Sequence, residues 1–311
     1  MNAHHQSVKT SIQCSGILNE ALNVTKCERK AATHFAICHG KRIKFFINLH
    51  SGIKYIKNTV SAYNKKLTLL LYVLPFIPWE LLKIARLGYF VNISLHPSVA
   101  EAVPTSNRWN VLVGTYDEAQ KLVLQCYSHQ DDRCTFVKIG NHGSDNQMKR
   151  EIHFLQKNLQ FQNFAIPTLL YATLADECSP FNIQVTEEIE GEPIPAILTD
   201  EIYQIAQEIA GESTIINGEA YSFSHGDFAP WNIRKNTSTY TVFDWELCKM
   251  RPIGYDLAYF VIMTEIALHK RNFNEAYDIA KKRIRALNPN IQLDKNRIYK
   301  EFAKTTKTLQ F

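Results

Sequence analysis

The stretch Phe223-Ser-His-Gly-Asp-Phe-Ala-Pro-Trp-Asn232 is the part of this chain that decides how the rest is interpreted. His225, Asp227 and Asn232 form the pattern H-x-D-x-x-x-x-N within it. Twelve residues after Asn232, Asp244 stands inside the apolar run Val242-Phe-Asp-Trp-Glu246. Two carboxylates and a carboxamide at this spacing predict one site that can accept a proton and hold a divalent cation.

Phosphoryl transfer to a hydroxyl is the chemistry that needs these residue types. One carboxylate must orient the attacking hydroxyl and accept its proton, and Asp227 is the candidate for this catalytic role. Oxygen ligands must hold Mg²⁺ against the phosphates while charge develops on them, and Asn232 and Asp244 are the candidate metal ligands.

The segment His225–Asn232 resembles the catalytic loop of the aminoglycoside phosphotransferase and choline kinase superfamily. Protein kinases normally have H-R-D-L-K here, whereas this chain has Gly226 in place of the Arg and Ala229 in place of the Lys. The resemblance implies an α+β, two-lobed protein-kinase-like fold, with a small antiparallel-sheet N-lobe and a mainly helical C-lobe. It also implies ATP and Mg as cofactors and a small hydroxylated acceptor.

A protein substrate is disfavoured by the segment that follows the metal-binding strand. Only eleven residues separate Asp244 from Asp256, and no A-P-E sequence follows. A protein kinase needs a longer activation segment there to dock its peptide. The acceptor class therefore stays with small molecules, among which a sugar, an amino alcohol and an aminoglycoside all remain open.

Upstream residues match the expected nucleotide-binding half. Lys138 lies in the strand-like Phe136-Val-Lys-Ile139, and Glu151 follows thirteen residues later in a segment with apolar residues at helical spacing. The resemblance implies that Glu151 holds Lys138 against the α/β-phosphates. The helical apolar positions are Met148, Ile152, Leu155 and Leu159.

The segment Asn182–Gly191 resembles the fifth strand and hinge of the family. The resemblance implies that the backbone of residues 186–190 meets adenine between the lobes, so Glu187, Glu188 and Ile189 join the candidate nucleotide-binding residues. The expected phosphate loop departs from the pattern, because the hairpin predicted for residues 109–123 holds only Gly114. A binding-only pseudokinase with a regulatory or scaffolding role is therefore kept as the alternative function.

Three regions are expected along the chain. Residues 1–105 form a basic and apolar N-terminal extension, 106–191 the N-lobe, and 192–311 the C-lobe with the catalytic loop. The C-lobe is expected to begin with a helix over 199–210, capped by Thr199 and buried through four apolar residues, and to end with helices near 256–269, 273–287 and 293–305. The four buried residues are Ile202, Ile205, Ala206 and Ile209.

Composition places the chain among ordinary globular proteins, with 45% hydrophobic and 21% charged residues. Seven scattered cysteines without a C-x-x-C pair predict a reduced, cytoplasmic setting. The net charge of +5 is uneven, since residues 1–66 carry eleven Lys and Arg against two acidic residues. No nucleic acid is expected as a partner, because no recognition motif accompanies this basic segment.

The apolar run over residues 67–79 allows two interpretations. It is too short for a spanning helix and contains Pro75 and Pro78. Pro78 is expected to start a helix over 79–87, which packs on the N-lobe through Leu81, Leu82 and Ala85. Peripheral contact with a membrane is the alternative.

Two other groups of reactive side chains are interpreted as structural. Cys27, His34, Cys38 and His39 lack the short cysteine pair of a zinc finger. Cys248 has no basic partner predicted beside it, so an inert thiol is expected. His225 and Asp256 are both expected to brace the catalytic loop.

Overall fold

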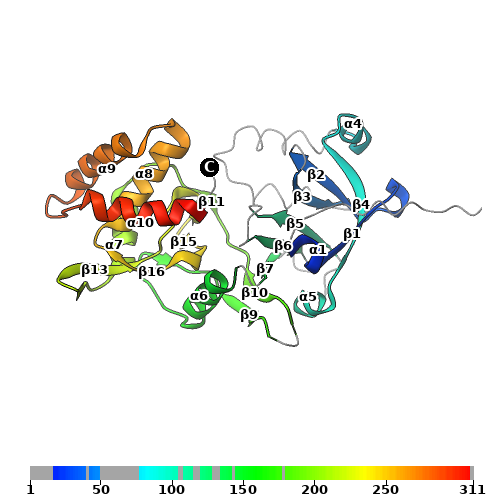
Figure 1. The fold of residues 1–311 in the computed structure, drawn as a ribbon, viewed down its shortest axis with the longest axis horizontal. Coiled ribbons are helices and arrows are strands. Elements are labelled where there is room, and N and C mark those ends of the chain that lie inside the picture. The colour runs from blue at the N-terminus through cyan, green and yellow to red at the C-terminus, as the bar shows by residue number, and fades with distance from the viewer. Residues whose placement is uncertain are drawn as a thin grey trace, which may run out of the picture. The chain divides into compact units, whose positions relative to one another are not determined.

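The computed structural model describes residues 17–39, 42–49, 77–103, 108–114, 120–127, 134–141, 144–176 and 179–308. These residues form two compact units. The first contains the described residues up to Asp145, together with Leu170–Glu188; the second contains Asn146–Leu169 and the chain from Ile189 onward. The predicted α+β class is confirmed, with an antiparallel sheet in the first part and a mainly helical second part (Figure 1).

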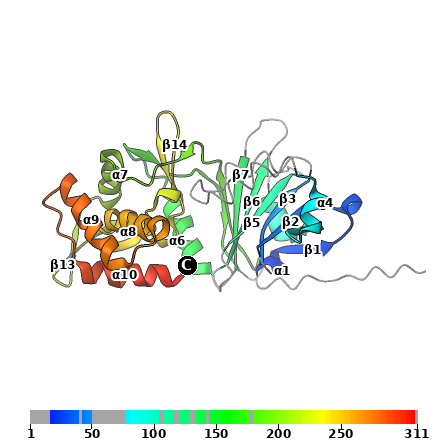
Figure 2. The same ribbon diagram turned by 90° about the horizontal axis from the view of Figure 1, so that it is seen from above.

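The first unit is built on a nine-stranded sheet (Figure 2). From β1 to β10 along the sheet, each neighbouring pair runs antiparallel. Its strands, in spatial order, are β1 (Leu22–Lys26), β4 (Gly88–Leu95), β2 (His34–His39), β3 (Arg42–Asn48), β5 (Trp109–Val113), β6 (Lys121–Tyr127), β7 (Cys134–Gly140), β10 (Asn182–Glu187) and β9 (Leu169–Thr173).

The expected division near residue 105 does not interrupt this sheet. Strand β3 pairs with β5 through Phe45↔Leu112 and Phe46↔Val111. Phe46 on one side and Val111 on the other are both fully buried in the same apolar core. The described strands before residue 105 therefore extend the N-lobe sheet and are not a separate extension. Pairing between strands so far apart in sequence is set by tertiary packing, which local pattern does not reveal.

Among the described residues of the first unit, three short helices accompany the sheet: α1 (Ile17–Ala21), α4 (Trp79–Ile84) and α5 (Pro97–Ala102). Helix α4 does start after Pro78, but the face predicted for it is wrong. Leu82 is buried against Phe90 of β4, whereas Leu81 is 54% exposed and Ala85 is also exposed. The helix has only six residues, so it offers the sheet little more than one inward position.

Most of the apolar run predicted over residues 67–79 lies outside the described residues. No helix within the described ranges combines the length and the apolar character needed to cross a bilayer. The membrane contact considered for this run stays a prediction.

The second unit begins with most of helix α6 (Asp145–Gln156), whose predicted apolar face is largely confirmed. Met148, Ile152 and Leu155 are buried. Leu159 is a correction: it follows the end of the helix and is 41% exposed. The helical spacing predicted for it does not apply once the helix has ended.

Helix α7 (Asp200–Ala210) confirms the prediction for its segment. Thr199 is the N-cap, and its hydroxyl accepts a hydrogen bond from the Ile202 backbone N–H at 3.4 Å. All four apolar residues expected on its inner face are buried. The capping side chain and the 3.6-residue spacing are both local features of the sequence, so they are sufficient to predict this helix.

Three further helices pack together in the second unit: α8 (Tyr255–His269), α9 (Phe273–Leu287) and α10 (Lys295–Thr308) (Figure 1). The predicted ranges are confirmed to within a few residues. Helix α8 is buried on all sides from Tyr255 to Glu265. A helix that is apolar all round belongs to the interior of a unit, and α8 occupies that place in the second core.

Two small sheets complete the second unit. One has the order β11-β14-β15-β8 and the other β12-β13-β16. They are formed by β8 (Phe164–Ala165), β11 (Glu192–Pro193), β12 (Thr214–Ile216), β13 (Glu219–Ser224), β14 (Ile233–Lys235), β15 (Tyr240–Val242) and β16 (Lys249–Pro252). Strand β13 leads into the His225–Asn232 loop, so this loop is anchored at both ends by strands.

Candidate active site

A short hairpin brings the two predicted metal ligands together. Strands β14 and β15 pair in the register Ile233↔Val242, which places Asn232 and Phe243 opposite each other at the end of the hairpin. The Phe243 N–H donates to the Asn232 carbonyl at 3.1 Å. Asn232 and Asp244 therefore lie at the same end of one hairpin.

The Asn232 side chain is fixed by Asp227. Its amide nitrogen donates to the Asp227 main-chain carbonyl at 2.9 Å and to the Asp227 carboxylate Oδ2 at 2.8 Å. The main-chain carbonyl can only accept, so the amide NH₂ must face Asp227. The amide oxygen of Asn232 is thereby turned away from Asp227, in the role that a metal ligand requires.

Asp227 is a buried carboxylate with one oxygen unsatisfied. The residue is 8% exposed, and its Oδ1 has no hydrogen-bond partner among the described residues. The pKa of Asp227 is raised to about 7, chiefly by burial and then by the nearby Asp244 carboxylate, while the side chains of Tyr259 and Asn232 act in the opposite direction. A carboxylate with a pKa near neutrality is suited to general-base chemistry.

His225 braces the loop, as expected. Its Nδ1 accepts from the Asp227 N–H at 3.2 Å, so Nε2 carries the proton and donates to the Phe243 carbonyl at 2.9 Å. Burial lowers the pKa of His225 to about 4, although Asp256 and the hydrogen bond to Phe243 oppose this change. The imidazole is therefore neutral at physiological pH and links the loop to the β15 end without a proton-transfer role.

Asp256 is the second brace, and it holds three consecutive residues. Its Oδ1 accepts from the Ser224 hydroxyl at 2.7 Å and the Gly226 N–H at 3.1 Å, and its Oδ2 accepts from the His225 N–H at 2.8 Å. The residue is 6% exposed and lies in the first turn of α8. One carboxylate thus fixes the entrance to the catalytic loop, which confirms the role expected for it.

Gly226 is required by the path of this loop. Its φ is +91°, a conformation that glycine adopts without steric cost. A Cβ at this position would meet the Leu247 carbonyl and the Arg251 guanidinium. The glycine that replaces the Arg of protein kinases therefore allows close packing of the loop against residues 247–251.

Asp244 occupies a left-handed conformation, with φ 70° and ψ 57°. Few residues other than glycine adopt it, and such strained positions cluster at functional sites. The 3₁₀ turn Trp245–Leu247 follows directly. Trp245 is fully buried, and its ring stacks on Phe154 with a centroid separation of 4.1 Å. The buried tryptophan anchors the segment that presents Asp244.

Two further carboxylates, those of Glu151 and Glu246, extend the site beyond the predicted metal ligands Asn232 and Asp244. Single side-chain oxygens of Glu151, Asp244 and Glu246 all lie within 4.8 Å of one another. Glu151 is 2% exposed and accepts a hydrogen bond from the Trp245 N–H at 3.2 Å. Glu246 was missed in the sequence, although its position two residues after Asp244 is a signal that could have found it.

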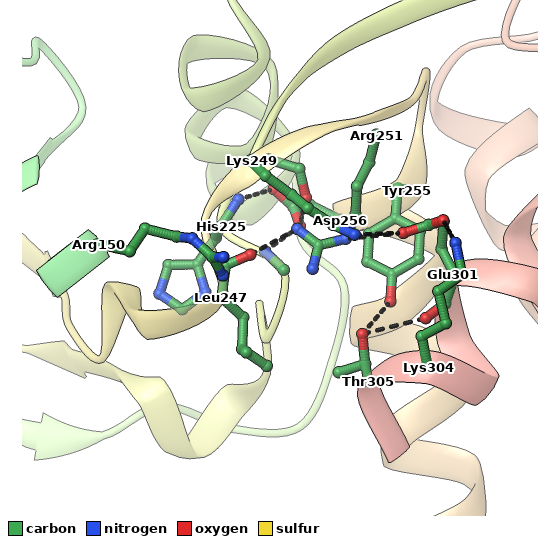
Figure 3. A network of polar contacts seen from close by, with 12 residues as sticks. Arg150, His225, Leu247, Lys249, Arg251, Tyr255, Asp256, Glu301, Lys304 and Thr305 are labelled. Atoms are coloured by element: carbon green, nitrogen blue, oxygen red, sulfur yellow. Dashed lines mark hydrogen bonds and ion pairs between the residues drawn. The ribbon is translucent and has the colours of Figure 1, made fainter. Parts of the chain in front are cut away.

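Arg251 connects the catalytic region to the C-terminal helix (Figure 3). Its Nη1 donates to the Leu247 carbonyl at 2.7 Å, and its Nε lies 3.9 Å from Glu301 Oε2 on α10. The guanidinium also covers the ring of Tyr255, with 5.0 Å between the guanidinium carbon and the ring centroid. Arg251 is 3% exposed. A buried charge is stable only with such partners around it.

Two lysines complete the network around Glu301 (Figure 3). Lys249 and Lys304 approach its carboxylate at 2.7 and 2.6 Å; burial acts to raise the pKa of Glu301, but these lysines hold it below the usual value. The exposed lysines contribute little energy individually. The network fixes where α10 sits against β16, which directly follows the 3₁₀ turn after Asp244.

The remaining predicted nucleotide-binding residues lie in the first unit, or at its boundary. Lys138 is on the interior strand β7, with Gln184 of β10 as its Cα partner. Glu188 accepts a hydrogen bond from the Cys134 N–H at 3.2 Å, and Glu187 ends β10 with an exposed side chain. Ile189 is the residue at which the chain re-enters the second unit after Glu188. Lys138 and Glu151 belong to different units, so their pairing stays a prediction.

Cys248 and His34 are two reactive side chains for which a structural role is expected. The Cys248 thiol is buried, and burial raises its pKa to about 11, so it is held in the unreactive protonated form. The two ring nitrogens of His34 contact the Thr33 hydroxyl and the Trp109 carbonyl, each at 2.8 Å. These contacts give His34 a structural role in the sheet.

The segment that carries this geometry can be compared with known families. Residues 212–287 match the family model described as the phosphotransferase enzyme family, APH. The resemblance predicted from the catalytic loop is thereby confirmed for this segment. The APH match lies within the second unit and contains Asp227, Asn232, Asp244 and Asp256. Among curated proteins, none matches this chain.

Three solved structures are similar to the chain at a low level. Amicoumacin kinase hAmiN, in complex with AMP-PNP, Ca²⁺ and Ami, has a TM-score of 0.35 and 11% identity, over 58% of this chain and 73% of that one. A putative fructosamine-3-kinase from Haemophilus somnus 129PT has a TM-score of 0.34 and 11% identity, over 65% of this chain and 92% of that one. Spectinomycin phosphotransferase APH(9)-Ia, in complex with ADP and spectinomycin, has a TM-score of 0.37 and 12% identity, over 69% of this chain and 93% of that one. The site is therefore assigned from its own geometry and the APH match.

Proposed function

We propose that this protein is an ATP- and Mg²⁺-dependent phosphotransferase that acts on the hydroxyl of a small molecule. The observation that carries the proposal is the arrangement of Asp227, whose carboxylate is buried, close to Asp244 and oriented by Asn232. In this proposal Asp227 orients the acceptor hydroxyl and takes its proton. The APH match over residues 212–287 supports the same reaction class.

The donor set fits a divalent cation. Asn232 offers an amide oxygen, and Asp244 offers a carboxylate that lies within 4.8 Å of those of Glu151 and Glu246. Hard cations such as Mg²⁺ prefer oxygen ligands of this kind. When bound, Mg²⁺ would neutralise charge on the phosphates. The same positive charge would relieve the repulsion between the Asp227 and Asp244 carboxylates, so Asp227 would be ionised more readily.

The nucleotide contacts are proposed from the sequence. Lys138 would contact the α/β-phosphates with the help of Glu151, and the backbone around Glu187, Glu188 and Ile189 would meet adenine. Gly114 follows β5, and its N–H donates to the Lys121 carbonyl at 2.9 Å, so the hairpin closes next to it. The rest of the expected phosphate loop lies outside the described residues.

The acceptor is proposed to be a sugar, an amino alcohol or an aminoglycoside. The short chain between Asp244 and Asp256 supports a small acceptor, because the 3₁₀ turn, β16 and the start of α8 occupy most of it. A cytoplasmic setting is part of the proposal and rests on the scattered cysteines, five of which are free thiols in the described residues.

ADP release from Mg·ATP by the purified chain tests the proposal, with a panel of sugars, amino alcohols and aminoglycosides as acceptors. We expect one acceptor class to accelerate ADP release and to yield a phosphorylated product. Asp227→Asn should lower turnover by at least about 100-fold, the usual range for loss of a general base, while the Mg·ATP-dependent rise in Tm persists. Asp278→Asn, an exposed carboxylate on α9, is the matched control and should behave as the wild type.

Three other outcomes would contradict parts of the proposal. Turnover by Asp227→Asn at the wild-type rate would remove Asp227 from the catalytic role. Binding of Mg·ATP by the wild type without turnover on any acceptor would favour the binding-only pseudokinase. Absence of Mg·ATP binding altogether would overturn the proposed function.

A further inference from the structure

Tyr259 is a buried tyrosine that the proposed chemistry has not yet used. It lies on α8 three residues after Asp256, so the two side chains share one face of the helix. Asp256 on this face binds the backbone of residues 224–226. The same face therefore directs Tyr259 toward the loop residue that follows, Asp227.

The Tyr259 hydroxyl and one Asp227 oxygen are both buried without an ordinary hydrogen bond. Tyr259 is fully buried, and neither its hydroxyl nor Asp227 Oδ1 has a partner of normal geometry within the described part of the chain. Each nevertheless interacts with the other, since the Tyr259 hydroxyl is among the groups that lower the pKa of Asp227. An unsatisfied buried donor thus lies beside an unsatisfied buried acceptor.

Leaving both groups unpaired would be costly. A buried polar atom without a hydrogen bond costs about 1–3 kcal/mol, and more if it is charged. Asp227 Oδ2 is already satisfied by the Asn232 amide, so Oδ1 is the oxygen that needs a donor. The Tyr259 hydroxyl can supply that donor through a small rotation, because a phenol O–H turns freely about its C–O bond.

We propose that Tyr259 donates a hydrogen bond to Asp227 Oδ1 and is a positioning residue for the catalytic carboxylate, an inference that rests on the proposed function. Asn232 then holds Oδ2 and Tyr259 holds Oδ1, so the plane of the carboxylate is fixed from both sides. Each oxygen keeps a second lone pair, which leaves an acceptor site for the substrate hydroxyl. Tyr259 itself does not contact the reacting atoms.

The environment of Tyr259 keeps it a donor. Burial raises its pKa well above the ordinary value, and the charge of Asp227 raises it further, so the phenol stays protonated throughout the physiological range. The ring is held by its neighbours: it stacks on Tyr255 with a centroid separation of 5.7 Å and lies at the same distance from Phe302 of α10. Because the ring is held rigidly, its hydroxyl oxygen has one fixed position.

Tyr255 provides a matched control on the same helix. It is equally buried and carries the same hydroxyl, but that hydroxyl is paired with Thr305 at 3.2 Å. Tyr255→Phe and Tyr259→Phe therefore remove the same atom from two stacked rings. Only the second substitution removes a donor that faces Asp227.

The first readout is steady-state hydrolysis of Mg·ATP, with water as the acceptor. We expect Tyr259→Phe to lower kcat by about tenfold or more, the loss that follows from one hydrogen bond to a charged group, with KM for ATP within about twofold of wild type. Tyr255→Phe should leave kcat unchanged. A kcat for Tyr259→Phe equal to wild type, or an equal loss in both variants, would overturn the proposal.

The second readout does not require turnover. Urea unfolding at pH 8 is measured for wild type, Tyr259→Phe, Asp227→Ala and the double variant, and the same cycle is repeated with Tyr255→Phe. Tyr259→Phe should shift the unfolding equilibrium about tenfold more when Asp227 is present than when it is absent. The Tyr255 cycle should show no such coupling. Coupling without any ATP turnover would retain the hydrogen bond and reject the proposed function, whereas turnover without coupling would reject the role of Tyr259 alone.

Discussion

Asn232 and Asp227 are joined twice, because one amide group donates both to the main-chain carbonyl of Asp227 at 2.9 Å and to its carboxylate at 2.8 Å. The five-residue separation allows the loop to close on itself. As a result, the proposed metal ligand and the proposed base cannot change orientation independently.

Asn232→Asp should therefore destabilise the protein in a pH-dependent way. The new oxygen would face Asp227 Oδ2, and two carboxylates in contact cannot both be ionised without a large cost. We expect a fall in unfolding free energy of roughly 3 kcal/mol or more at pH 8, and a smaller loss near pH 5, where one carboxyl is protonated and can donate. Urea unfolding in EDTA at the two pH values measures this.

Asn236→Asp is the control for that substitution. In the described part of the chain, the Asn236 side chain accepts hydrogen bonds from the Ser238 N–H at 3.0 Å, the Ser238 hydroxyl at 3.4 Å and the Thr239 N–H at 2.7 Å, and donates none. A carboxylate can accept the same bonds, so little change is expected. An equal loss in both variants at pH 8 would contradict the orientation assigned to Asn232.

The stability of the metal-free protein should depend on pH through two groups of opposite sign. The pKa of Asp227 is raised to about 7, so the folded state holds its proton more tightly, and stability falls as pH rises from about 4 to 7. The pKa of His225 is lowered to about 4, so stability is lost as pH falls from about 6.5 to 4. In the wild type the two effects largely cancel over this window.

Asp227→Asn removes one of these opposing contributions. We expect its unfolding free energy to drop more steeply than that of wild type between pH 6.5 and 4, by on the order of 3 kcal/mol, because the protonation of His225 in the unfolded state is no longer offset. Unfolding in EDTA at half-unit pH steps measures the difference. Parallel curves for the two proteins would show that Asp227 does not titrate near neutrality.

Asp256→Asn should loosen the entrance to the catalytic loop. Asp256 accepts three hydrogen bonds, and an amide in its place can accept at one oxygen only, while its NH₂ would face a donor. A loss of about 2–4 kcal/mol of unfolding free energy is expected, measured by urea unfolding. The exposed Asp278→Asn on α9 should change stability by less than about 0.5 kcal/mol. A wild-type value for Asp256→Asn would contradict its bracing role.

Gly226→Ala and Gly218→Ala separate two costs of a side chain at positive φ. Both glycines have positive φ, at +91° and +79°. A Cβ at 218 would meet no atom within 4 Å, whereas a Cβ at 226 would meet the Leu247 carbonyl and the Arg251 guanidinium. We expect roughly 1–2 kcal/mol of destabilisation at 218 and clearly more at 226. Equal Tm shifts for the two variants would show that the loop can relax around the added methyl group.

Much of the second unit could be predicted from local pattern. The cap at Thr199, the buried face of α7 and the ranges of α8 and α9 depend on residues within a few positions of one another. Leu159 shows the limit of this reasoning, because spacing alone does not reveal that the helix has already ended.

The sheet of the first unit was harder to predict. Sequence pattern alone places strands β1 to β4 in an extension, because their partners lie far away in sequence and β-pairing depends on context. Glu246, Arg251 and Tyr259 were also missed as parts of the site. Glu246 lies only two residues after Asp244 and Arg251 four after Leu247, so their positions were available in the sequence, whereas nothing near Tyr259 in sequence indicates that it approaches Asp227.

The sequence by itself determined which chemistry is proposed for this protein: the order His225, Asp227, Asn232 and Asp244 fixes both the side-chain types and their spacing along a loop and a hairpin. Tertiary structure alone decided the state of those side chains. Burial and a neighbouring carboxylate bring the pKa of Asp227 to about 7, and α8 supplies Asp256 and Tyr259 from a distant segment. The physical reason is that the type and order of side chains are already present in the unfolded chain. Desolvation and the proximity of charges arise only when separate segments pack together.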